Sequence, residues 1–151
     1  MTTHKKLWKG VPFTLFLLLF SCSKSPVMWK HSKSYGTCSE YSSSKVHYKD
    51  PTSTRPLEIE LINTSDTSLL YINAHTLEFP AQKEHPDKSK VHITIDDEEI
   101  ETSAYRLQGG QRLLLDDDSR KLIVDALNNN KSVTIKVGRY KTVLSPKGFK
   151  H

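Results

Sequence analysis

The sequence of 151 residues has little cysteine, little glycine and few hydrophobic residues. Two cysteines, Cys22 and Cys38, cannot build the framework of several disulfides that holds many small secreted domains together. Six glycines without a period exclude a collagen-like or glycine-repeat protein. The hydrophobic fraction of 36% and the mean hydropathy of −0.53 are low, yet they do not indicate disorder of the whole chain. The length predicts a single domain.

The sequence also lacks a hydrophobic run long enough to span a membrane as a helix. Its longest uncharged apolar run has ten residues, Val11 to Phe20, whereas a spanning helix needs about 20. Three lysines precede this run, and the small residues Ser21 and Cys22 follow it. A cationic lead, a short apolar run and a small-residue exit are typical of a secretory signal. Residues 1–21 are therefore predicted to be a signal peptide.

The four residues Leu19, Phe20, Ser21 and Cys22 resemble the lipobox of bacterial lipoproteins. Leu19 and Ser21 match its usual form, and Phe20 is bulkier than the common residue there. The resemblance implies cleavage between Ser21 and Cys22, diacylation of the Cys22 sulfur and acylation of its new amino group with a palmitate-type chain. It also implies that the protein is anchored in the cell envelope, and Ser23 after the cysteine implies the outer membrane in a diderm. Three acyl chains hold a protein stably, whereas one is marginal; the alternative is an ordinary secreted protein with a free Cys22.

The net charge of +5 is not concentrated in the part predicted to fold. Residues 1–21 contain three lysines and no acid, which leaves 19 basic and 17 acidic residues after cleavage. Residues 51–151 contain 14 basic and 15 acidic residues. Because a nucleic-acid binder concentrates its cations on the folded part, we expect no nucleic-acid partner.

Residues 22–56 show no helical or strand period. The segment 23–56 contains nine serines, with prolines near both ends. This composition predicts a flexible tether behind the lipidated Cys22. Four aromatic residues interrupt it: Trp29, Tyr35, Tyr41 and Tyr48. They are expected to dock on the domain or lie in the lipid interface, with a partner-binding motif as a further alternative.

From residue 57 onward the pattern changes to that of short strands. Leu57, Ile59 and Leu61 alternate with Glu58 and Glu60, which indicates one buried face and one charged face. Similar patterns predict about seven strands, over 57–61, 69–72, 91–95, 100–105, 112–115, 133–137 and 140–144. Residues 57–151 are therefore predicted to form a mainly β domain, an antiparallel β-sandwich or small barrel.

One late α-helix is expected between the last two pairs of strands. Asp116 to Asp118 provide an N-cap and negative charge at its start. Four apolar residues then fall on one face at helical spacing: Leu122, Ile123, Ala126 and Leu127. Three asparagines, 128–130, end it, because Asn tolerates the left-handed conformation.

No residue is assigned to catalysis, to a metal or to a cofactor. The sequence contains no Gly-x-Ser-x-Gly motif, and Cys38 lies in the predicted tether as an incidental thiol, with a reactive thiol or an intermolecular disulfide as the alternative. The candidate metal ligands are His47, His75, His85 and His92. These histidines lack ligand spacing, so we expect solvated surface side chains.

Two acidic runs and a glycine pair have structural explanations. Residues 96–99 are predicted to form a hairpin tip and residues 116–118 a helix start, with a calcium site as the alternative. Gly109 and Gly110 predict a turn with positive φ, and with Arg112 an anion-binding nest is the alternative.

These features predict a lipid-anchored envelope protein without enzymatic activity. Its β-rich domain is expected to bind or scaffold another envelope component, through contacts whose partner the sequence does not identify. One alternative is an exported lipoprotein that binds a small ligand in an apolar pocket. The other is an exported hydrolase.

Overall fold

The computed structural model describes residues 29–35, 42–50 and 57–150. Within these ranges the chain forms nine strands and one helix, and every pair of neighbouring strands is antiparallel. The elements are β1 (Trp29–Ser34), β2 (Ser43–Lys49), β3 (Leu57–Asn63), β4 (Ser68–Ala74), β5 (Lys88–Ile95), β6 (Glu98–Arg106), β7 (Arg112–Leu114), α1 (Asp117–Asn128), β8 (Val133–Val137) and β9 (Tyr140–Leu144). The predicted mainly β, antiparallel class with one late helix is confirmed.

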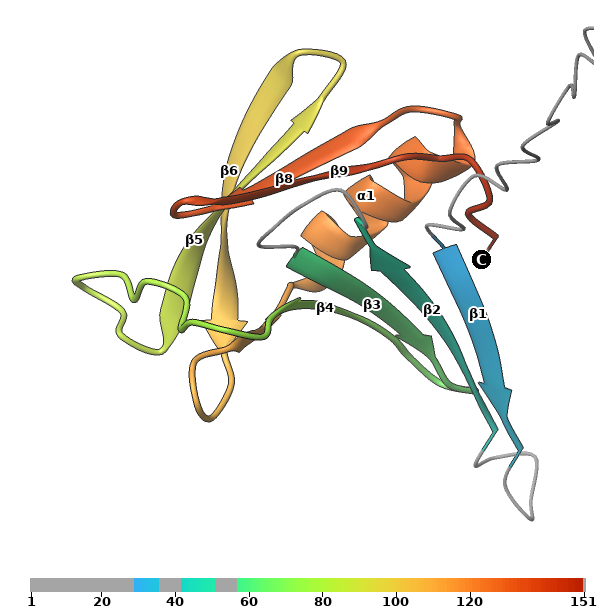
Figure 1. Ribbon diagram of the computed structural model, residues 1–151, viewed down its shortest axis with the longest axis horizontal. Coiled ribbons are helices and arrows are strands. Elements are labelled where there is room, and N and C mark those ends of the chain that lie inside the picture. The colour runs from blue at the N-terminus through green and yellow to red at the C-terminus, as the bar shows by residue number, and fades with distance from the viewer. Residues whose placement is uncertain (1–28, 36–41, 51–56, 151) are drawn as a thin grey trace, which may run out of the picture.

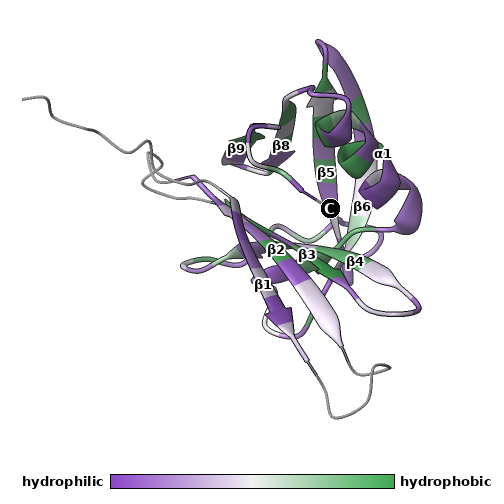
Figure 2. Ribbon diagram, turned by 90° about the vertical axis from the view of Figure 1, so that its right-hand side faces the viewer, coloured by the Kyte–Doolittle hydropathy of each residue, from purple (hydrophilic) through white to green (hydrophobic). Residues whose placement is uncertain are grey.

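The strands form one curled sheet, a half-barrel, in the order β1-β2-β3-β4-β7-β6-β5-β8-β9. The sheet has two limbs, β1 to β4 on one side and β6, β5, β8 and β9 on the other, which β7 joins (Figure 1). Helix α1 contacts β4 of one limb and β8 of the other. Figure 2 shows the limbs from the side, with α1 next to the second. The helix therefore helps to fill the inside of the curl.

All seven predicted strands are present, and alternation of buried residues is clear on β5, β8 and β9, whereas β6 buries only Ala104. On β3, Leu57, Ile59 and Leu61 are each at most 1% exposed. The hairpin tip between β5 and β6 consists of Asp96 and Asp97, with φ of 49° and 67°. Two consecutive positive φ values are what a two-residue type I′ hairpin loop requires. The first acidic run thus makes the tight turn that its position predicts.

The prediction that residues 22–56 form a flexible tether is wrong for two segments. Residues 29–34 and 43–49 are the strands β1 and β2, and they extend the sheet beyond β3. Trp29, Val46 and Tyr48 are at most 3% exposed. The folded unit therefore includes residues before position 57, among them β1 and β2. Tyr35, by contrast, is exposed, while Cys22, Cys38 and Tyr41 lie outside the described residues.

Aromatic side chains connect the two edges of the curled sheet. The Trp29 indole Nε1 donates to the backbone carbonyl of Ser145 at 2.6 Å, and the Tyr48 hydroxyl donates to that of Val143 at 2.6 Å. The ring of Trp29 also lies 4.6 Å from that of Tyr48 and 4.9 Å from that of Phe149. We call Trp29, Tyr48 and Phe149 the aromatic seam, because side chains join β1 and β2 to the β9 end where no strand pairing does.

Helix α1 begins and ends close to the predicted residues. Asp116 is its N-cap, and its Oδ1 accepts from the Ser119 backbone N–H at 2.7 Å. At the other end Asn129 is the C-cap and Asn130 has a positive φ of 59°. The buried face differs from the prediction, because Ser119 and Val124 are also buried while Leu122 is only partly buried.

Candidate functional site

Cys22, predicted to carry the lipid anchor, and Ser21, predicted to precede the cleavage site, lie outside the described part of the chain. Processing and acylation at these positions therefore stay predictions. Among the described residues, no helix is long and apolar enough to cross a membrane.

The candidate metal ligands separate into three places. His47 of β2 and His75 after β4 converge on one carboxylate, that of Glu58 on β3. His92 of β5 instead lies beside Glu99, with Nδ1 2.6 Å from Oε1, and His85 is exposed in the loop before β5. Within the described ranges no group of three or more histidine, cysteine, aspartate or glutamate side chains could hold a metal ion.

Glu58 is the centre of a buried ionic cluster that the alternating pattern of β3 does not predict. Glu58 is only 7% exposed. Its Oε1 lies 2.7 Å from Lys49 Nζ, and its Oε2 faces the two histidines. Desolvation by burial alone would raise the pKa of Glu58. Hydrogen bonds from Lys49, His75 and His47 outweigh it and lower that pKa to about 2. Glu58 is thus an ionised carboxylate that ties β2, β3 and the end of β4 together.

The neighbouring carboxylate on the same face of β3, Glu60, holds a second set of cations. Lys45 Nζ lies 2.6 Å from its Oε1 and Arg112 Nη2 lies 3.0 Å from its Oε2. The Arg112 guanidinium also stacks 3.9 Å from the centre of the Tyr71 ring. Arg112 is therefore engaged with β3 and β4, which does not support the alternative of an anion site formed with Gly109 and Gly110.

The glycine pair shapes the turn between β6 and β7. Gly109 and Gly110 have φ of 86° and 66°, and a Cβ at Gly110 would lie 2.6 Å from the Arg106 side chain. The Gly110 carbonyl accepts from the Phe79 backbone N–H at 2.8 Å. The predicted turn with positive φ is confirmed, and the missing side chain lets the β4–β5 loop approach it closely.

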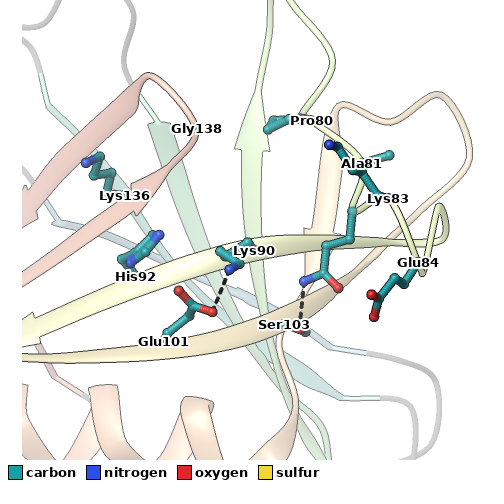
Figure 3. A pocket seen from close by; sticks show the side chains of 11 residues that line it. Pro80, Ala81, Lys83, Glu84, Lys90, His92, Glu101, Ser103, Lys136 and Gly138 are labelled. Carbon is teal, nitrogen blue, oxygen red and sulfur yellow. Dashed lines mark hydrogen bonds and ion pairs between the residues drawn. The ribbon is translucent and has the colours of Figure 1, made fainter.

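A polar depression of about 660 Å³ lies on the second limb of the sheet (Figure 3). Its wall is the loop 80–84, and its floor is formed by side chains of three neighbouring strands, β6, β5 and β8. The turn after β8 packs against the same loop, since a Cβ at Gly138 would lie 3.0 Å from the Pro80 ring. The lining residues are Pro80, Ala81, Gln82, Lys83, Glu84, Lys90, His92, Glu101, Ser103, Lys136 and Gly138. We refer to this feature as the polar depression.

Pairing within the polar depression leaves two lysines available. Lys90 Nζ lies 2.7 Å from Glu101 Oε1, and this hydrogen bond lowers the pKa of the Glu101 carboxyl (Figure 3). Gln82 Nε2 donates to Ser103 Oγ at 2.8 Å. Lys83 and Lys136 are exposed and have no ion pair with any described residue. Glu84, also exposed in the lining, has no ion pair with a described residue either. The depression can therefore offer two ammonium groups, one carboxylate and several polar side chains to a polar partner, with an excess of positive charge.

The described histidines other than His85 face a carboxylate or a backbone carbonyl. His31 Nε2 lies 3.1 Å from the Gly148 carbonyl, and His47, His75 and His92 face glutamates. Between residues 29 and 150, outside the gaps 36–41 and 51–56, no hydrogen bond joins a histidine to a hydroxyl or a thiol.

Comparison with known proteins adds no assignment, because no protein family, curated protein or solved structure matches this chain.

Proposed function

We propose that this protein is a lipid-anchored component of the bacterial cell envelope whose β-rich domain binds another envelope component. The anchor would be Cys22, on the strength of the signal-like residues 1–21 and their lipobox-like end. The binding surface would be the polar depression.

The observation that carries the binding role is the contrast between the inside and the outside of the curled sheet. The inside is filled by a continuous cluster of buried side chains from the strands and from α1, including Ile72, Ile93, Leu113, Ile123 and Ile135, all fully buried. The polar depression lies on the solvent side and presents unpaired lysines. A partner that brings carboxylates or other polar groups fits this surface better than an apolar small ligand does.

The two alternatives receive less support. A small-ligand lipoprotein needs an apolar cavity, and the hydrophobic side chains named above pack against one another instead. An exported hydrolase of the serine or cysteine type needs a nucleophile hydrogen-bonded to a base, a pair that the described histidines do not form. A metal-dependent hydrolase needs a ligand group, and the described residues contain none.

The anchor is tested by metabolic labelling with a fatty acid. In wild type we expect label in the mature protein, and Cys22→Ala should lose the label and accumulate with its signal unprocessed by the lipoprotein route. Unchanged incorporation in Cys22→Ala would refute the anchor. Ser23→Ala serves as the control, because the acceptor cysteine stays in place.

The binding surface is tested by charge reversal. The acylated protein is used to capture partners from detergent extracts of the envelope, and Lys83→Glu/Lys136→Glu is compared with Lys121→Glu/Lys131→Glu. Both variants change the net charge equally, and the control lysines are exposed outside the depression. We expect a saturable partner that wild type and the control retain and that the depression variant loses by about tenfold or more. Equal capture by the two variants would place the binding surface elsewhere.

A further inference from the structure

The positive charge of the fold is concentrated at one corner. The described residues before position 51 and after position 144 carry six lysines and a single carboxylate, Asp50. Residues 57–144 carry 11 basic and 15 acidic residues. The two basic segments, far apart in the sequence, lie side by side because the Trp29 indole reaches the Ser145 carbonyl and His31 reaches the Gly148 carbonyl.

Four of these lysines have no acidic partner. Lys30, Lys33, Lys147 and Lys150 are exposed and form no ion pair with a described residue, and we call them the basic corner. Lys45 and Lys49, the other two, are neutralised by Glu60 and Glu58. Lys33 and Lys150 line the same groove, whereas Lys30 lies on the opposite face of β1 and Lys147 lies on the chain segment after β9. The four ammonium groups add positive potential to this end of the fold without a neighbouring carboxylate to neutralise it.

A shallow groove of about 420 Å³ at this corner has a lining suited to anionic headgroups. Its lining contains cations, hydroxyls and an amide, and no carboxylate: His31, Ser32, Lys33, Ser44, Lys45, Val46, Asn63 and Lys150. Ammonium groups next to hydroxyl and amide donors are the groups that bind phosphate oxygens.

The distance to Cys22 limits where this corner can lie. Only six residues, 23–28, separate Cys22 from Trp29. A chain reaches at most about 3.5 Å per residue, so Trp29 cannot lie more than about 25 Å from an acylated Cys22. With β1 and β2 in the sheet, the long predicted tether is reduced to this short connection, and the corner that begins at Trp29 stays near the bilayer surface.

We propose that the basic corner docks the folded domain on an anionic lipid surface, with the groove accepting lipid phosphate groups. This proposal rests on the lipid anchor of the proposed function, which holds the domain within reach of the headgroups. Each lysine close to an anionic membrane strengthens binding about fivefold, and the attraction extends about one Debye length, roughly 8 Å at physiological salt. Docking would fix the orientation of the domain and leave the polar depression, on the other limb, free for its partner.

Lysine footprinting tests the orientation with the protein as it exists in the envelope. The acylated chain is reconstituted into vesicles of phosphatidylcholine alone or with about one third phosphatidylglycerol, and amine acetylation of each lysine is followed by mass spectrometry. We expect the basic corner to react about threefold or more slowly in the anionic vesicles, and to recover at about 0.5 M salt. Lys83, Lys121, Lys136 and Lys141 are the internal controls and should react equally in both vesicles. Equal rates at all eight lysines in the two vesicles would overturn the proposal.

Matched variants give the second readout. Lys45 also lines the groove, so its acetylation should slow in wild type on anionic vesicles. Lys30→Gln/Lys33→Gln/Lys147→Gln/Lys150→Gln should lose this protection of Lys45, whereas the same change at the four control lysines should not. Thermal melts show whether each variant is folded. If free polyphosphate with neutral vesicles protects the corner as well as anionic lipid does, the corner recognises phosphate in solution and the membrane proposal fails.

Failure of the anchor is distinguishable from failure of the docking surface. Intact-mass analysis reports whether the isolated protein carries acyl chains. If it carries none, the anchor is refuted, and flotation of the same protein with the two vesicle types tests the corner alone. Flotation with anionic vesicles that the four-lysine variant loses about tenfold or more would support the corner, and its absence would refute it.

Discussion

The two edge hairpins of the sheet are built in different ways. The β8–β9 hairpin buries every second residue, with Val133, Ile135 and Val137 all inaccessible and Leu144 opposite Val133. The β1–β2 hairpin is rich in serine and lysine, and of its 13 strand residues only Trp29, Val46 and Tyr48 are buried. A few large aromatic side chains can thus stabilise an edge hairpin. Each aromatic side chain buries about 150–250 Å², and Trp29 and Tyr48 also donate hydrogen bonds to backbone carbonyls on the opposite edge.

Breaking the aromatic seam should give the largest effect. Trp29→Ala removes a 3% exposed ring together with the hydrogen bond to Ser145, and we expect a loss of about 3–5 kcal/mol in the free energy of unfolding. Tyr35→Ala is the matched control, since Tyr35 is 80% exposed and should change stability by less than about 0.5 kcal/mol. Denaturant unfolding measures both. Equal stability of the two variants would mean that residues 29–34 form a tether and do not pack as β1.

Truncating a buried side chain of α1 tests the packing of the helix against the sheet. Leu127 is 3% exposed, so Leu127→Ala should cost about 2–5 kcal/mol through lost transfer energy and a cavity. Leu122→Ala should cost clearly less, because Leu122 is only partly buried. Thermal melts of the two variants decide this, and a larger effect at Leu122 would mean that α1 is rotated relative to the sheet.

The Glu58 cluster, which connects the N-terminal hairpin to the rest of the sheet, should make stability depend on pH. The pKa of Glu58 lies near 2 in the folded protein and near 4.5 in the unfolded chain. The carboxylate therefore contributes up to about 3 kcal/mol above pH 4.5, and this contribution disappears as the pH falls towards 2. Glu58→Gln should be less stable at pH 7 and should flatten the pH dependence between these values.

The control for this prediction is Glu101→Gln. The pKa of Glu101 is also lowered by Lys90, but the side chain is exposed to solvent, where ion pairs contribute little. Denaturant unfolding at a series of pH values should show a strong dependence in wild type and in Glu101→Gln. A wild-type profile that is flat below pH 4.5 would contradict the cluster.

The helix cap should give the smallest effect. Asp116→Ala removes the acceptor of the Ser119 N–H and should cost about 0.5–2 kcal/mol. Because Asp116 caps a helix, neither calcium nor a chelator should change its thermal melt. A melting temperature that rises with calcium in wild type, and not in Asp116→Ala, would favour the calcium alternative.

Much of the fold could be predicted because its signals are local. The period-two alternation in residues such as Val133, Ile135 and Val137 predicts strands, and Asp116 with the asparagines after residue 127 predicts both helix ends. β1 could not be predicted in this way, because an edge strand with one buried residue has no alternation to detect. Its signal was the aromatic residue Trp29 in a serine-rich segment.

The Glu58 cluster and the polar depression could not be predicted from neighbouring residues in the sequence. His47 and His75 are 28 positions apart, and only the pairing of β2 with β3 and β3 with β4 brings both to Glu58. The polar depression likewise combines a loop, β5, β6 and β8, whose order in the sheet differs from their order in the chain.

The amino-acid sequence by itself determined the antiparallel β class, seven of the nine described strands, the tight turn at Asp96 and Asp97, and the limits of α1. Each depends on neighbours a few residues apart, where side-chain periodicity and backbone preference act directly. Only the tertiary structure decided that the serine-rich segment joins the sheet, that Glu58 is buried beside cations and that the two segments with the four unpaired lysines adjoin. The physical reason is that burial and charge pairing depend on which strands become neighbours. That choice comes from the curl of the sheet and the seam of Trp29, Tyr48 and Phe149 that joins its edges.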